Sequence, residues 1–309
     1  MSVLGHGVAP EVIDAMVEAT DRFFALPLDE KVRYRSPRPE VNRGYAAKGT
    51  EGLTYSLGVD GRPPDLFEAF NIGPETCPPG VPADRPEFAP NIWPERPDGL
   101  RDAIVPYFTA VGTLARRITS VMALALGLDV RFFDDKTDHS TDTLRVNHYE
   151  RGAGEPSPVP GQQRMGAHTD YGIVTVLYAD RVPGLEIVGP DGEWHGVVPP
   201  EGAFLVNLGD LLAEWTNDRW RSTLHRVVPP PSSVDGAAVR RSMAFFHDGN
   251  YDAVIECLPT CCSADNPPRY PRMVAGEHLM AKLLGPRTLT SSDAISTAGA
   301  RVNAVTRQT

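Results

Sequence analysis

The sequence predicts a mainly β fold, braced by helices, whose core is a jelly roll or a barrel. The first observation is a series of eight short apolar segments, separated by turn-forming residues, in the second half of the chain. The second is a pair of helix-periodic segments in the first half. The third is composition: of 309 residues, 41% are hydrophobic and 23% are charged, as in a globular protein with a sizeable core.

The first half is expected to supply the bracing helices. Apolar residues recur at helical spacing from 10 to 26, where Pro10 suits the first turn and Pro27 suits the end. A longer helix is predicted over 98–127, and Gly127 suits its C-terminal cap. A helix of this length can serve as a strut against a sheet.

The remaining N-terminal segments are less regular. Residues 3–8 resemble the end of a strand whose beginning is absent, so the chain either starts late or has a naturally short N-terminus. Residues 35–97 are rich in Pro and Gly, which favours loops, and one short strand is expected at 65–72. A loop-rich segment of this length is uncommon in a compact domain unless it has a role, such as covering a site.

The second half of the chain changes to a strand pattern. We expect a single domain over 1–285, with a helical and loop-rich part over 1–135 and the core over 140–260. A short helix at 276–284 is expected to close the domain, and the Ser/Thr/Ala/Gly-rich residues 286–309 are expected to form a disordered tail. The eight predicted strands are 143–149, 173–178, 185–188, 194–198, 203–208, 223–228, 240–247 and 253–257.

Charge and cysteine usage narrow the class of protein. The net charge of −10 disfavours a nucleic-acid partner, which would require a basic surface. The sequence predicts neither a membrane span nor a secretory signal, because no sufficiently long apolar run is present. The four cysteines lack paired CxxC spacing, so we expect neither a zinc site nor a disulfide framework, and a cytoplasmic location is the simplest. The oligomeric state is left open.

His168 and Asp170 lie two residues apart at the mouth of an apolar, β-branched segment. Because strand side chains alternate, both are expected on one face. Such a pair is commonly a capped turn or a surface ion pair, but His225, 55 residues after Asp170, could add a third ligand. Two histidines and one carboxylate form the open-faced set of non-haem Fe(II) oxygenases. Zinc hydrolases also use these ligands, but their usual HExxH helix is absent.

The predicted strand 240–247 carries two adjacent arginines in an apolar context. Arg240 and Ser242 share one face by the two-residue alternation, and Arg241 takes the other face. A buried guanidinium must meet an anion, and one beside a hydroxyl can bind a carboxylate through two bonds. The anion is either a ligand carboxylate or a structural Asp or Glu.

These motifs resemble the Fe(II)/2-oxoglutarate-dependent dioxygenases of the isopenicillin N synthase-like group. The resemblance extends over most of the chain, from Gly5 to about Leu284. It is densest in Asn147-His-Tyr149, His168-Thr-Asp170, Val206-Asn-Leu-Gly-Asp210, Trp215-Thr-Asn217, Ser222-Thr-Leu-His225-Arg-Val227, Arg240-x-Ser242 and Asn266-Pro-Pro-Arg-Tyr-Pro271. The order of these motifs is more specific than any one of them.

The resemblance implies a double-stranded β-helix core and an enzyme that requires Fe(II). Its metal ligands would be His168, Asp170 and His225. The family reaction couples oxidative decarboxylation of 2-oxoglutarate, to succinate and CO2, with oxidation of a substrate C–H bond. Hydroxylation is the usual outcome, desaturation or ring closure are variants, and a small molecule of secondary metabolism is the expected substrate.

The resemblance also implies a binding site for the co-substrate 2-oxoglutarate. Arg240 and Ser242 would bind its C5 carboxylate, with Tyr149 and Asn147 assisting from the facing strand. The long connection 229–238 leaves some choice between Arg240 and Arg241, and we favour Arg240 because it shares a face with Ser242.

Substrate-contacting residues are expected in the loop 43–72, which in this family commonly closes over the substrate, and at the end of the strand 240–247. The aromatic side chains among them could instead belong to the core. The candidates are Arg43, Phe67, Phe70, Asn71, Phe246 and His247.

Two alternative functions remain at the level of the sequence. One is an oxidase like isopenicillin N synthase, which needs no 2-oxoglutarate and takes all electrons from its substrate. The other is a non-catalytic barrel that binds a metal or a ligand. Succinate release with turnover would separate the first of these from a 2-oxoglutarate-dependent enzyme. The sequence does not identify the substrate, because fold alone does not determine it.

Overall fold

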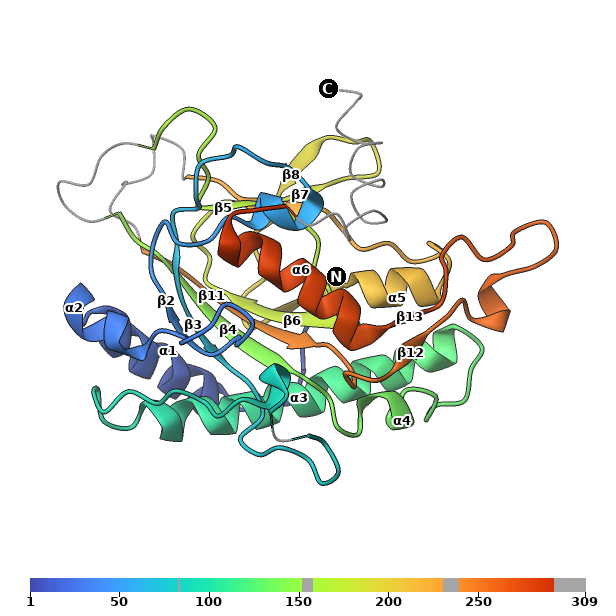
Figure 1. Ribbon diagram of the computed structural model, residues 1–309, viewed down its shortest axis with the longest axis horizontal. Helices are drawn as coiled ribbons and strands as arrows, with labels where there is room; N and C mark the ends of the chain where they lie inside the picture. Colours follow the sequence, from blue (N-terminus) through green and yellow to red (C-terminus); the bar gives the residue numbers. More distant parts are fainter. Residues whose placement is uncertain (83, 152–157, 230–238, 292–309) are drawn as a thin grey trace.

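The computed structural model describes residues 1–82, 84–151, 158–229 and 239–291, and it confirms the predicted jelly roll with bracing helices (Figure 1). A seven-stranded antiparallel sheet has the order β1-β9-β6-β11-β4-β3-β2, and a four-stranded sheet has the order β5-β10-β7-β8. The strands of the larger sheet are β1 (Ser2–Val3), β2 (Gly44–Ala46), β3 (Glu68–Ile72), β4 (Thr143–Tyr149), β6 (Val174–Ala179), β9 (Phe204–Leu208) and β11 (Arg240–His247). Those of the smaller sheet are β5 (Met165–His168), β7 (Leu185–Val188), β8 (Trp194–Gly196) and β10 (His225–Val227). A separate pair is formed by β12 (Val254–Ile255) and β13 (Met273–Val274).

Helices lie on both sides of the larger sheet (Figure 1). The helices α1 (Pro10–Phe24) and α3 (Leu100–Ala125) cover its outer face, and α6 (Ala275–Thr288) lies on the opposite side. The shorter helices are α2 (Leu28–Lys31), α4 (Asp134–Thr137) and α5 (Asp210–Trp215), with 3-10 turns η1 (Val32–Tyr34), η2 (Leu53–Leu57), η3 (Pro86–Phe88) and η4 (Pro259–Cys261). None of the helices in the described ranges combines the length and hydropathy that crossing a membrane requires.

Side-chain alternation gives the larger sheet two chemically different faces. On β4 and β11, Leu144, Val146, Met243 and Phe245 are buried in one apolar cluster with residues of α1 and α3. The intervening residues of the same strands face a cavity and are largely polar. This is the expected consequence of a two-residue period when one face packs against helices.

The two bracing helices follow their predicted periodicity. Phe23 of α1 and Ile104 of α3 are fully buried in the same cluster. The predicted helix 98–127 ends at Ala125, and Gly127 then adopts a positive φ of 72°, a conformation that glycine accepts without a steric penalty.

The N-terminal half differs from the prediction in two places. The expected strand at 65–72 begins only at Glu68, and it pairs with β2, which was not predicted. A three-residue strand in a Pro/Gly-rich segment carries too little periodicity to be recognised, and only its pairing with β3 defines it. Of the expected strand end at 3–8, only Val3 is in a strand, where it pairs with Phe204.

The end of the closing helix was also predicted incorrectly. The closing helix, expected at 276–284, runs from Ala275 to Thr288 and includes Pro286. The expected tail therefore cannot begin at residue 286, and residues 292–309 lie outside the described residues. The extent of the domain over 1–285 stays a prediction.

Packing of α3 on the sheet gives a stability prediction. Ile104→Ala should lower the free energy of unfolding by about 2–5 kcal/mol, because it leaves a cavity among fully buried side chains. Val121→Ala on the exposed side of the same helix should change it by less than about 0.5 kcal/mol. Urea unfolding of the metal-free proteins measures both, and equal losses would contradict the assigned packing.

Candidate metal and anion site

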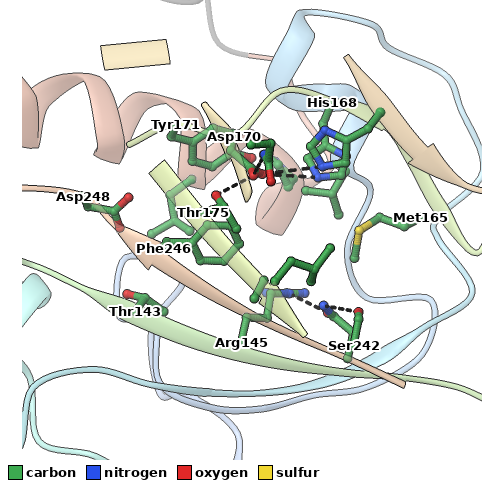
Figure 2. Close-up of a pocket in the computed structure, with 18 of the residues that line it drawn as sticks. Thr143, Arg145, Met165, His168, Asp170, Tyr171, Thr175, Ser242, Phe246 and Asp248 are labelled. Carbon is green, nitrogen blue, oxygen red and sulfur yellow. Dashed lines mark hydrogen bonds and ion pairs between the residues drawn. The ribbon is translucent and has the colours of Figure 1, made fainter. Parts of the chain in front are cut away.

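Three predicted ligand side chains converge in a cavity of about 450 Å³ between the two sheets (Figure 2). The ligand atoms of His168, Asp170 and His225 all lie within 4.8 Å of one another. Asp170 Oδ1 is 3.9 Å from His168 Nε2 and 3.7 Å from His225 Nε2. The two histidines also face each other across paired strands, with ring centroids 4.2 Å apart.

His168 and Asp170 reach this point by a route that the sequence did not suggest. The expectation that they occupy one face of one strand was wrong. His168 ends β5 in the smaller sheet, whereas Asp170 lies in the connection to β6 of the larger sheet. The carboxylate meets the imidazoles because the chain crosses from one sheet to the other between these residues.

The two imidazoles are oriented by their own backbone. His168 Nδ1 lies 2.8 Å from the carbonyl of Gly166, and His225 Nδ1 lies 3.0 Å from that of Thr223. Because a carbonyl only accepts, each Nδ1 carries the hydrogen and each Nε2 presents a lone pair toward Asp170. Burial, and secondarily the neighbouring His225, lowers the pKa of His168, which favours the neutral form that metal binding requires.

Asp170 is held in a complementary state. Its Oδ2 accepts hydrogen bonds from Thr175 Oγ1 at 2.6 Å and from Asn207 Nδ2, which leaves Oδ1 for a ligand. Burial by itself would raise the pKa of this carboxyl group, but the two imidazoles and the two hydrogen bonds bring it below its usual value. Two imidazole nitrogens and one carboxylate oxygen directed to one point are a donor set that fits a divalent transition metal.

Arg240 faces inward, as the alternation predicts. Its side chain is 2% exposed, and neither Nε nor Nη1 has a hydrogen-bond partner in the described part of the chain. Arg241 takes the other face, where its side chain pairs with Asp21 and its backbone N–H donates to Asp180 Oδ2. A buried guanidinium with two unused donors fits an anionic ligand.

A chain of hydrogen bonds orients the hydroxyl group of Ser242, which shares the cavity face with Arg240. Arg145 Nε donates to Asn147 Oδ1 at 3.0 Å, which fixes the orientation of that amide. Asn147 Nδ2 then donates to Ser242 Oγ at 3.3 Å. The hydroxyl oxygen is therefore an acceptor, and its hydrogen can be donated to Tyr149 or to a carboxylate beside Arg240.

Tyr149 lies directly opposite Arg240 in the sheet register. Its ring is 5.0 Å from Arg240 Cζ, and its hydroxyl contacts the weak acceptor Met165 Sδ, at 3.7 Å, and the Ser242 hydroxyl. This hydroxyl can turn to a stronger acceptor at little cost. Met165, Leu185 and Val227 form an apolar cluster around it, so an anion held here is shielded from water.

The predicted substrate residues are only partly brought together. Phe246 and Arg43 line the cavity. The guanidinium of Arg43 is nevertheless engaged, because its three nitrogens donate to the backbone carbonyls of Asn42, Glu87 and Ala89. Three of its five N–H groups therefore hold the loop together.

The other four candidates do not line the cavity. Phe67 packs against Tyr149, and Phe70 belongs to the apolar cluster beneath the helices. Asn71 accepts a hydrogen bond from Arg145. The alternation of β11 turns the side chain of His247 to the face opposite the cavity. There its Nδ1 lies 2.9 Å from Asp142 Oδ1.

Several cavity residues were missed in the sequence. Arg145, on the cavity face of β4, forms an ion pair with Glu51, and Arg287 of α6 approaches the same carboxylate at 3.8 Å. Asp248 follows β11 and faces the cavity beside Phe246 (Figure 2). Arg145 could have been identified from the sequence, because strand alternation puts it on the same face as Asn147. Glu51 and Arg287 could not, because no strand pattern in the sequence relates them to the cavity.

Comparison with known proteins agrees with this geometry. A family model described as the 2OG-Fe(II) oxygenase superfamily matches residues 140–249, and one described as the N-terminal region of non-haem dioxygenases in morphine synthesis matches residues 1–96.

Individual relatives cover most of the chain. It is 36% identical over 280 residues to the 2-oxoglutarate-Fe(II) type oxidoreductase hxnY of Emericella nidulans, covering 87% of this chain and 76% of the relative. It is 33% identical over 281 residues to validamycin A dioxygenase of Streptomyces hygroscopicus subsp. limoneus, covering 90% and 75%. The crystal structure of a full-length Neurospora crassa protein in complex with alpha-KG and thymine aligns with a TM-score of 0.78 at 31% identity, covering 91% of this chain and 86% of that one.

The hydrogen bond from Asn207 to Asp170 can be tested by metal titration. Asn207→Ala should weaken Co(II) binding by about 10–100-fold, because the carboxylate loses one of the two donors that orient it. His195→Ala, which removes an exposed histidine outside the cavity, should leave the affinity unchanged. Visible absorption of bound Co(II) measures both, and an unchanged affinity in the Asn207 variant would contradict this role.

Proposed function

The chain belongs to the 2OG-Fe(II) oxygenase superfamily, and from that premise we propose that His168, Asp170 and His225 hold its ferrous ion. The protein is a dioxygenase that uses Fe(II) and 2-oxoglutarate to oxidise a small-molecule substrate. The resemblance identified in the sequence is confirmed. The donor set, with both Nε2 lone pairs and one carboxylate oxygen directed to one point, supports the ligand assignment.

We further propose that Arg240 and Ser242 bind the C5 carboxylate of 2-oxoglutarate. The observation that carries this assignment is the pair of unused donors on Arg240, buried in the cavity that also contains the three candidate ligands. The hydroxyl of Tyr149 would add a further donor, and Asn147 would act through Ser242. An acid anchored at this depth directs its other end toward the metal site.

The chain's own residues then have defined roles in the reaction. Iron held here supplies the redox chemistry for dioxygen activation. The ionised Asp170 offsets part of the metal charge, and the backbone carbonyls hold both imidazoles in the ligating orientation. The apolar side chains around Tyr149 exclude water from the bound acid. For hydroxylation, RH, 2-oxoglutarate and O2 give ROH, succinate and CO2, with one oxygen atom going to each organic product.

Neither alternative function has comparable support. The relatives named above include a 2-oxoglutarate-Fe(II) type oxidoreductase and a dioxygenase, and the Neurospora crassa protein was crystallised with alpha-KG. A 2-oxoglutarate-independent oxidase is therefore not favoured. A non-catalytic barrel is not favoured either, because the three candidate ligands are present and converge.

We also propose a setting for the enzyme. All four cysteines are free thiols, which supports the reducing cytoplasm as its location. The net charge of −10 supports a partner other than nucleic acid. One relative is, by its name, a dioxygenase of validamycin A, and this supports a small-molecule substrate, which we place in secondary metabolism.

A compound that stimulates succinate formation is a candidate substrate. Its turnover should release one succinate for each substrate molecule oxidised, because the oxidations of the substrate and of 2-oxoglutarate share one dioxygen. Chromatographic quantification of succinate and product measures the ratio. His168→Ala should abolish both, whereas His195→Ala should retain both. Product formed without succinate would instead support the oxidase.

The two adjacent arginines provide a matched pair for the co-substrate site. Arg240→Met should raise the Kd for 2-oxoglutarate by about 10–100-fold, because a charge-assisted pair of hydrogen bonds is lost. Arg241→Met, on the opposite face of the strand, should leave this Kd close to that of the wild type. The charge-transfer absorption of the anaerobic Fe(II) and 2-oxoglutarate complex measures both. A larger effect at Arg241 would overturn the assignment.

A further inference from the structure

Asp248 is a buried carboxylate that the roles described above do not use. Asp248 is 5% exposed and directly follows the last residue of β11, and its side chain lines the cavity. Figure 2 shows its carboxylate directed into the cavity, on the side where Phe246 and Thr143 also lie. Within the described part of the chain, its oxygens accept no hydrogen bond and form no ion pair. A carboxyl group that lines a cavity without a partner from the described residues is available to a ligand.

The carboxylate lies close to the metal site. Its Oδ1 is 2.1 Å from the position that a Cβ atom on residue 172 would occupy, so only glycine at that position leaves room for it. Gly172 is two residues beyond Asp170, in the same connection between the sheets. A group bound to Asp248 is therefore beside the turn that carries the candidate metal ligand.

The neighbouring polar groups are acceptors. Thr141 Oγ1 donates to the carbonyl of Gly249 at 3.1 Å, and Thr143 Oγ1 donates to that of Thr141 at 3.4 Å. Both hydroxyl hydrogens are thus used, and both oxygens line the cavity as acceptors. The ring of Phe246 is the aromatic surface on this side, and aromatic faces attract cations.

The charges around Asp248 are negative. Burial, and secondarily the charges of Asp142 and Asp170, raises the pKa of Asp248 well above its usual value. The guanidinium of Arg145 donates to Asn147, Asn71 and Glu51, and in the described part of the chain it forms no ion pair with Asp248. A cation entering the cavity would favour the ionised form of Asp248, whereas an anion would disfavour it.

We infer that Asp248 receives a protonated amine or guanidinium group of the substrate, with Phe246 and the Thr143 oxygen completing the site. The inference rests on the proposed function, since it assigns the substrate class of the same cavity. An ammonium group carries only donors, and it therefore matches the ionised carboxylate of Asp248 and the hydroxyl oxygen of Thr143, which are acceptors. Asp248 would also fix the distance between this charged group and the oxidised carbon, and so select the C–H bond that reacts.

Binding to the anaerobic Fe(II) and 2-oxoglutarate complex tests the inference with probes of matched length. Hexylamine, N-acetylhexylamine and hexanoate are titrated separately, and the perturbation of the charge-transfer band gives each Kd. The wild type should bind hexylamine at least about tenfold more tightly than N-acetylhexylamine, because only the ammonium forms a charge-assisted bond with the carboxylate. Hexanoate should bind most weakly.

Variants then assign the preference to one residue. Asp248→Asn keeps the shape but removes the charge, and it should abolish the preference for hexylamine. Asp248→Lys should reverse the preference toward hexanoate. Asp252→Asn makes the same chemical change in the same segment at a solvent-exposed residue outside the cavity, and it should retain the wild-type preference. Thermal unfolding of each variant verifies that it is folded.

The outcomes separate this inference from the proposed function. If the charge-transfer band forms but no probe perturbs it, or the wild type binds the amine and its acetylated form equally, the inference is wrong. A preference that survives in Asp248→Asn would also overturn it. If the band does not form with Fe(II) and 2-oxoglutarate, the proposed function itself fails.

Discussion

The two-residue alternation of β4 and β11 is the constraint on which the rest of the structure depends. One face of these strands carries Leu144 and Phe245 into the core beneath the helices, and the other carries Arg145 and Arg240 into the cavity. A shift of register by one residue would exchange the two sets, burying guanidinium groups among apolar side chains and exposing the core to the cavity. The packing of α1 and α3 therefore fixes the chemistry on the other side of the sheet.

Burial of so many polar groups is tolerated because most of them are paired with one another. Arg145 binds Glu51, and Asn147 links the same guanidinium to Ser242. Against this background of satisfied groups, the unpartnered ones become informative. The unpartnered nitrogens of Arg240 are buried, and the carboxyl group of Asp248 lines the same cavity at another place. The two groups fit ligands of opposite charge.

The site is assembled from parts that the fold holds independently. The smaller sheet supplies both histidines, and the connection to the larger sheet supplies the carboxylate. Helix α6 is fastened to this region by Lys282, whose Nζ lies 3.2 Å from the buried Asp210 Oδ2. The same oxygen accepts a hydrogen bond from Thr169, between the two candidate ligands of that turn. The covering helix and the metal site are thus linked through one carboxylate.

The jelly roll and its two bracing helices could be predicted because they rest on local periodicity, which 143–149 and 240–247 display clearly. The short strand β2 could not be predicted, because its three residues are recognisable as a strand only from their pairing with β3. The same distinction applies to side chains. Alternation predicted that Arg240 points inward, but it does not apply to His168 and Asp170, because His168 ends β5 and Asp170 lies in the connection that follows it.

The sequence by itself determined the ligand types, the order of the motifs and the facing of Arg240, because these follow from residue identity and short-range geometry. Only the tertiary structure decided which residues meet in the cavity. Glu51 reaches Arg145 across 94 residues, and Asp248 reaches the turn of Asp170 from the end of another strand. Tertiary packing also placed Phe70 in the apolar core and His247 against Asp142, so neither lines the cavity. Contacts between distant segments depend on how the sheets and loops pack, and no local pattern records that packing.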